Sequence, residues 1–145
     1  MTTPPGDPEP TGRVIKALTV RPPWSSAVIY RGKDVENRTQ PTKHRGLLAI
    51  HAGLRWDKDA VEPISNLAGA YYIGAPHGAI IGTVEVVGCH SGVDCAWSCS
   101  VWALPDHHHW VLANPKPLSE PIPCKGALGL WNVPADIAAR IEVTP

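Results

Sequence analysis

Short apolar segments bounded by turn residues recur along the chain, and their pattern predicts mainly strands. Each run is too short for a stable helix and is rich in β-branched or aromatic residues, which favours extended structure. The run from 79 to 87 is the strongest strand prediction, and Gly82 within it indicates a bend or a bulge. The predicted strands cover residues 17–20, 47–50, 79–87, 110–113 and 127–131.

Three other segments have helical spacing. The first covers residues 23–31, where Pro23 suits a first helical turn. The second covers residues 57–67, with Pro63 expected in the first turn or at a break. A closing helix is predicted from Pro134 to Ile141.

These elements together predict an α+β fold that is predominantly β. About five short strands joined by turns, with two to three short helices, are typical of a small closed or partly closed β-barrel with helices packed on it. Because a barrel of this size fills its interior with side chains, we expect a ligand to bind in a groove between barrel and helix.

Length and composition fit one domain. The chain has 145 residues, of which 43% are hydrophobic, so a wholly disordered chain is excluded. Residues 1–12 contain four prolines and two glycines, and we expect a disordered tail there and a single domain over residues 13–145. No apolar stretch reaches the roughly 20 residues of a membrane span and no signal peptide is evident, so we expect a cytoplasmic protein that does not bind membranes. The oligomeric state stays open.

The formal net charge of zero conceals an uneven distribution. Residues 13–58 hold ten Lys and Arg against three acidic residues, a net charge of +7, whereas residues 59–145 carry a net charge of −5. The basic segment therefore predicts a surface that faces an anionic ligand. The alternative is that folding mixes both segments into an ordinary exterior.

One cluster of charged residues within the basic segment is a candidate site. Glu36 and Arg38 would share a face of an extended strand, and Lys33 lies at the preceding helix-to-strand turn. A Lys beside a carboxylate and a guanidinium can polarise a carbonyl or hold a phosphate, and Arg can pair with a planar anion or a base edge. Ordinary surface ion pairs are the alternative.

These residues and their flanking segments resemble the ASCH (activating signal cointegrator homology) domain, a family of PUA-like β-barrels. The family signature is G-x-K-x-x-E-x-R, and this chain departs from it only by having Arg31 in place of the glycine. The resemblance spans about residues 14–135. It is carried by residues 17–24, by Gly32-Lys33-x-x-Glu36-x-Arg38, and by residues 46–52, 82–85, 109–112 and 126–131.

The resemblance implies a cleft beside the first helix that binds RNA, DNA or a nucleoside, without a cofactor. Trp24 would stack on a base or, alternatively, pack the helix onto the barrel. His51 would face the same cleft or be satisfied in the core. The expected ligand-binding residues are Thr19, Arg21, Trp24, Lys33, Glu36, Arg38, Lys43, Arg45 and His51.

One branch of the family suggests an enzymatic alternative. It removes the acyl group from N4-acetylcytidine and has the pattern K-x-x-T-x-R, in which the Thr position corresponds to Glu36 here. Lys33 would then polarise the amide carbonyl and Glu36 would activate water, with Glu85 as a second carboxylate or simply an outward-facing strand residue. A third class of function is a regulatory module that docks a protein partner.

Cysteine and histidine residues gather near the middle of the chain. Cys89-His90, Cys95, Cys99 and His107-His108-His109 place seven soft ligands within 21 residues. Without an export signal or a C-x-x-C knuckle, we expect reduced, free thiols and no metal. Two alternatives stay open: a disulfide, and a metal site for which we name Cys89, Cys95, Cys99 and His107, with His90 in place of Cys89 as a variant. Cys124 is expected to be buried or inert.

Overall fold

The computed structural model describes residues 14–69, 76–95 and 99–142. The predicted tail over residues 1–12 lies outside these described residues. Among the described helices, none is long and apolar enough to cross a bilayer.

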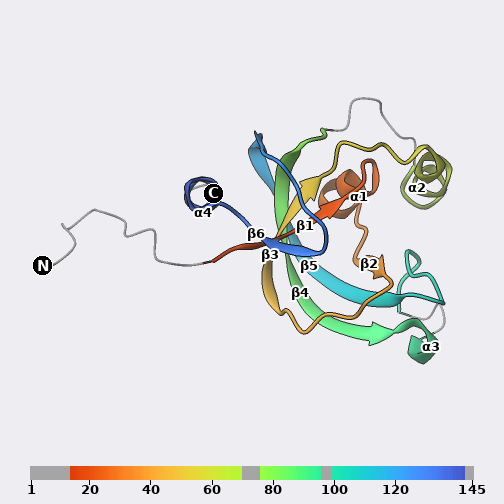
Figure 1. Ribbon diagram of the computed structural model, residues 1–145. Helices are drawn as coiled ribbons and strands as arrows, with labels where there is room; N and C mark the ends of the chain where they lie inside the picture. The colour runs from red at the N-terminus through yellow and green to blue at the C-terminus, as the bar shows by residue number, and fades with distance from the viewer. Residues whose placement is uncertain (1–13, 70–75, 96–98, 143–145) are drawn as a thin grey trace, which may run out of the picture.

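A mixed six-stranded sheet dominates the fold and curls into a half-barrel (Figure 1). Its spatial order is β2-β5-β4-β3-β1-β6. β1 and β3 pair in parallel, and the other neighbours pair antiparallel. The strands are β1 (Lys16–Val20), β2 (Val35–Arg38), β3 (Gly46–Ala52), β4 (Ala79–Ser91), β5 (His108–Pro123) and β6 (Leu130–Asn132).

In the part of the chain that the structure describes, four short α-helices and one 3₁₀ turn accompany the sheet. They are α1 (Trp24–Tyr30), the 3₁₀ turn η1 (Lys58–Ala60), α2 (Val61–Ala68), α3 (Gly92–Cys95) and α4 (Ala135–Glu142). This arrangement confirms the predicted α+β class with predominant β-structure. The helix expected over 57–67 is divided into η1 and α2, because the Asp57 side chain accepts a hydrogen bond from the Asp59 backbone amide and starts a separate turn. Pro63 falls in the first turn of α2, where its missing amide does no harm.

The core is organised by the alternation of side chains along the strands. Leu18 and Ile50 point toward α1, which lies within the curve of the sheet (Figure 1), and pack with Val28 of that helix. Ala17 and Ala49 point the other way and pack with the cluster that includes Ile141 of α4. The sheet therefore has one helix on each face, and α1 fixes the side on which a site can form.

Two strands extend well beyond their predicted bounds. β4 reaches Ser91, and β5 continues from the predicted strand over 110–113 through the proline-rich segment to Pro123. Within the described ranges, β2 pairs with residues 108–111 of β5, and no described strand pairs with the same edge of the proline-rich half. Prolines are tolerated there because their missing N–H groups leave no partner unpaired. The expected irregularity at Gly82 is confirmed, since the β4–β5 register shifts between Ile80 and Gly82.

Candidate functional site

A cavity of about 750 Å³ opens between α1, β2, α2 and the segment before β5. Side chains from six parts of the chain form its wall, which combines three cationic residues, two acids and two tryptophans with apolar neighbours. The residues that line it are Thr19, Val20, Arg21, Trp24, Lys33, Glu36, Asn37, Arg38, Asp57, Pro63, Leu67, Val101, Trp102, Ala103, Leu104 and Leu128.

The charged residues of the signature, Lys33, Glu36 and Arg38, line the cavity and form a ladder of two linked ion pairs. Lys33 Nζ donates to the Glu36 carboxylate at 3.1 Å and to the Val35 carbonyl at 2.7 Å. The other Glu36 oxygen accepts from Arg38 Nη1 at 3.3 Å. The Lys33 and Glu36 side chains are only 4% and 10% exposed, whereas that of Arg38 is 30% exposed. Because the Lys33–Glu36 pair is buried, water screens its attraction less than that of a surface ion pair. Arg38 is the solvent-facing end of the ladder.

Tryptophan rings supply the flat surfaces of the wall. Trp24 is held in place because its Nε1 donates to Asp57 at 2.9 Å, and Lys33 Nζ lies 5.4 Å from its ring centroid. Trp102 packs in the cluster that joins α1 and α2. Trp24 also contacts the core, so it both packs α1 and borders the cavity.

Asn37 ties the signature strand to the opposite wall. Its side-chain amide donates to the Trp102 carbonyl at 2.9 Å, and its carbonyl oxygen accepts from the Leu104 amide at 2.9 Å. The backbone of this wall segment is therefore fixed by a side chain that lies between Glu36 and Arg38. The sequence offered a signal for Asn37 in its position inside the signature, but it offered none for Asp57 or Trp102.

Thr19 and His51 belong to one buried hydrogen-bonded chain beside the cavity. Because a carbonyl can only accept, His51 Nε2 donates to the Cys124 carbonyl at 2.8 Å, and His51 Nδ1 accepts from the Thr19 hydroxyl at 3.1 Å. Trp131 Nε1 completes the chain by donating to Thr19 at 3.1 Å. Thr19 lines the cavity, whereas His51 is 2% exposed and does not.

The remaining residues expected at the site are dispersed. Arg21 lines the cavity and is exposed. Lys43 and Arg45 lie outside the cavity lining, on the exposed connection between β2 and β3, where Arg45 donates to the Thr42 and His44 carbonyls. Glu85, in β4, also lies outside the lining and accepts from Asn114 at 3.0 Å.

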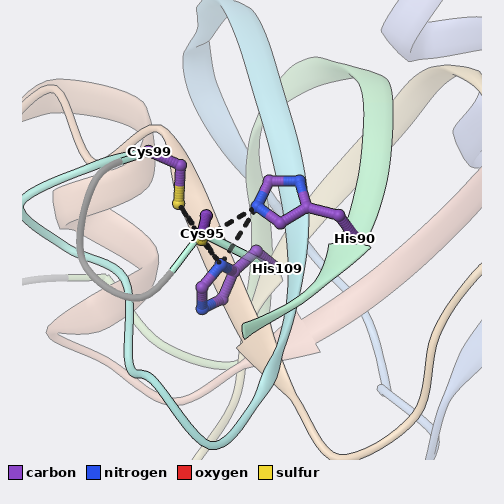
Figure 2. A group of neighbouring side chains, drawn as sticks. All are labelled: His90, Cys95, Cys99 and His109. Atoms are coloured by element: carbon purple, nitrogen blue, oxygen red, sulfur yellow. Dashed lines mark hydrogen bonds between the residues drawn. The ribbon is translucent and has the colours of Figure 1, made fainter. Parts of the chain in front are cut away.

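The cysteine and histidine residues form a second group of side chains, away from the cavity lining. Cys95 and Cys99 lie beside His90 and His109 (Figure 2). The pKa of the Cys99 thiol is raised to about 11, mainly by desolvation of the sulfur and to a smaller extent by its hydrogen bond with Cys95. Burial raises the pKa of the separate Cys124 thiol.

Two residues named for the metal alternative are not in this group. Cys89 packs against the core cluster under α1. His107 instead contacts Asp106 at 2.8 Å, and this hydrogen bond lowers the pKa of Asp106.

Comparisons with known proteins agree with this architecture. The crystal structure of an ASCH protein from Zymomonas mobilis superposes with a TM-score of 0.60 at 13% identity, covering 90% of this chain and 95% of that one. A tyrosine-to-phenylalanine variant of the same protein gives a TM-score of 0.61 at 14% identity, covering 92% of this chain and 100% of that one. At these identities the likeness shows the fold alone.

A search of curated proteins gave no significant match. The ASCH domain family model, however, matches residues 18–122, which include the whole signature and most of the cavity wall. The match covers well over half of the chain and agrees with the half-barrel fold. The chain therefore belongs to the ASCH domain family.

Proposed function

We propose that the cavity binds one nucleoside unit, either free or as part of a single-stranded RNA or DNA. The observation that carries the proposal is the combination of Trp24, Trp102 and the Lys33-Glu36-Arg38 ladder around one cavity. A cavity of about 750 Å³ falls within the roughly 300–1,000 Å³ typical of small-molecule sites, so it suits one nucleoside unit and not a duplex.

The base would lie against the tryptophan rings and the Arg38 guanidinium. Stacking of a base on an aromatic ring contributes about 1–3 kcal/mol and tolerates any base. Arg38 has four further N–H groups besides the one at Glu36, and it is the more exposed end of the ladder. Its fork geometry suits the edge of a base, and Glu36 holds the guanidinium in place.

Phosphate groups would contact the cations at the rim. Arg21 lines the cavity and is exposed, so it can neutralise the phosphate attached to a bound nucleoside. Lys43 and Arg45 lie outside the cavity, so they can serve only a ligand that extends beyond one unit. The contributions of Arg21 and of Lys43 therefore distinguish a mononucleotide from a polymer.

Binding is tested by fluorescence anisotropy with a labelled six-nucleotide RNA, the matching DNA and the duplex, between about 50 and 200 mM salt. We expect the single strands to bind, the slope of log K against log salt concentration to be about −0.7 for each phosphate contacted, and unlabelled nucleosides to compete. Arg38→Ala should weaken binding about tenfold or more. The matched control is Lys116→Ala, an exposed lysine of β5 outside the cavity. Equal affinity in Arg38→Ala and in the parent protein would refute the proposal.

The buried Lys33–Glu36 pair at the cavity wall favours a second candidate, hydrolysis of an acyl group on an N4-acylated cytidine. Lys33 would polarise the acyl carbonyl while Glu36 takes a proton from water. The resulting hydroxide would add to the acyl carbon, and the cytosine amine would leave after accepting that proton. In the present arrangement both Glu36 oxygens already accept hydrogen bonds from cations, so neither is placed to take a proton from water, and hydrolysis ranks below binding.

Release of cytidine from N4-acetylcytidine, followed by chromatography, tests the second candidate. Turnover that is lost in Lys33→Ala and in Glu36→Gln would establish it. Turnover in Glu85→Gln reports separately on Glu85, which is hydrogen-bonded to Asn114. Absence of turnover in the parent protein would remove this candidate and leave the binding proposal intact.

A further inference from the structure

Four potential metal ligands converge at the ends of β4 and β5. The side chains of His90, Cys95, Cys99 and His109 point toward a common centre (Figure 2). Cys95 Sγ lies 2.8 Å from Cys99 Sγ, 3.0 Å from His109 Nδ1 and 3.2 Å from His90 Nε2. His109 Nδ1 lies 3.3 Å from Cys99 Sγ and 3.2 Å from His90 Nε2.

The nitrogen–nitrogen separation is close to that which one tetrahedral ion requires, whereas the two sulfurs lie about 1 Å closer together than such an ion would hold them. Zinc binds sulfur at about 2.3 Å and histidine nitrogen at about 2.0–2.1 Å. The edges of such a tetrahedron are about 3.8 Å between two sulfurs and about 3.3 Å between two nitrogens. A small outward movement of the two cysteines, one of which is exposed, would bring the four donor atoms to these distances.

The hydrogen bond that His109 makes leaves its Nδ1 as the nitrogen that can bind a metal ion. This ring is fully buried, and its Nε2 faces the Leu104 carbonyl. Because a carbonyl only accepts, Nε2 carries the proton and the lone pair of the neutral ring lies on Nδ1, the atom beside both cysteines and His90. A backbone carbonyl that orients a histidine in this way is the usual outer support of a metal-binding histidine.

The backbone around the cluster is built to hold these residues in place. His90 and His109 are paired across β4 and β5, so the sheet fixes their spacing. The Gly92 amide donates to the His107 carbonyl at 2.8 Å. A side chain at Gly92 would overlap the Pro105 and His107 carbonyls, so only glycine allows this close approach.

We propose that His90, Cys95, Cys99 and His109 bind one Zn²⁺ ion in a closed, four-ligand site. Two thiolates balance the charge of the ion, and their two thiol protons are released to solvent on binding. Because all four positions are filled by the protein, the site is structural. It joins the two strands to the segment that continues into Val101 and Trp102, and so it fixes one wall of the cavity. A zinc ion at this position is the alternative to the free thiols expected from the sequence.

Metal content of the purified full chain tests the site. The protein is prepared without chelator, incubated with Zn²⁺, passed through gel filtration and measured by inductively coupled plasma mass spectrometry. We expect about one equivalent of zinc in the parent protein and in the control Cys124→Ser, whose thiol lies elsewhere, and a large loss in Cys95→Ser and Cys99→Ser. Zinc well below one equivalent in the parent protein would overturn the proposal.

A measurement on the parent protein alone covers the case in which the serine variants fail to fold. Replacement of Zn²⁺ by Co²⁺ should give the intense visible bands of a tetrahedral site and a near-ultraviolet thiolate-to-cobalt band. An octahedral cobalt spectrum without the thiolate band, or a Cys95–Cys99 disulfide found by mass spectrometry in freshly prepared protein, would overturn the proposal. These readouts do not involve a nucleic-acid ligand, so the zinc site and the proposed function are tested separately.

Discussion

Replacement of Lys33 by methionine tests the energetic role of the buried ladder. Methionine keeps most of the apolar stem but removes the ammonium group, which donates to Glu36 and to the Val35 carbonyl. One Glu36 oxygen then has no cationic partner, and the other keeps only Arg38, whose side chain is 30% exposed. The variant therefore leaves a carboxylate, 10% exposed, that is only partly compensated.

The expected loss of stability follows from this burial. Removing one partner of a buried ion pair costs about 3–5 kcal/mol, compared with a total stability of about 5–15 kcal/mol for a domain. The double variant Lys33→Met/Glu36→Met removes the stranded charge as well. It should be at least as stable as Lys33→Met, because an apolar pair of similar volume often replaces a buried ion pair without loss.

Urea unfolding monitored by far-ultraviolet circular dichroism measures these changes. With an m value of about 2 kcal/mol/M, the Lys33→Met midpoint should fall by about 2 M. The reasoning is refuted if Lys33→Met costs less than about 1 kcal/mol, as an exposed pair would. It is equally refuted if the double variant loses the sum of the two single losses, because residues in contact should couple by about 0.5–3 kcal/mol.

Three further predictions concern separate parts of the molecule. Gly126→Ala should destabilise the protein by about 1–3 kcal/mol in thermal unfolding, because the new Cβ would lie 2.6 Å from Thr19 Oγ1 and 2.7 Å from His51 Cε1; an unchanged melting temperature would contradict this close packing. Lys43→Ala should reduce the salt slope of log K for a six-nucleotide RNA by about 0.7 and leave competition by nucleosides unchanged; an unchanged slope would restrict the ligand to one unit. Removing zinc with a chelator should weaken RNA binding in anisotropy titrations, because the metal no longer holds the segment that carries Trp102 in the cavity wall, and added zinc should restore binding. Equal affinity with and without metal would contradict this coupling between the zinc site and the cavity.

The sequence predicted those features that depend on neighbouring residues. The apolar runs predicted β1, β3, β4 and β5, whereas the strand expected over 127–131 begins only at Leu130, as β6. The spacing of Glu36 and Arg38 correctly indicated an extended segment, since both lie in β2 and contact each other. The proline-rich half of β5 was missed because a free sheet edge, which makes proline acceptable, is a property of the tertiary pairing.

Contacts between residues far apart in the sequence could not be predicted from local patterns. Asp57 reaches Trp24 across 33 positions, and Asn37 reaches Trp102 across 65, so neither pair has a local pattern. The cysteine–histidine cluster shows the same limit. From the sequence, Cys89 or His90 was a candidate metal ligand, together with His107. Strand pairing decides which side chains meet, and it brings together His90 and His109.

Binding of a nucleoside unit in the cavity beside the signature can be located by a ¹H–¹⁵N correlation titration of the labelled protein with a short single-stranded RNA. We expect the largest shifts on residues 19–21, 36–38 and 101–104 at the cavity, and no shifts in α4, which packs on the other face of the sheet. Shifts concentrated on α4, or no shifts at all, would contradict it.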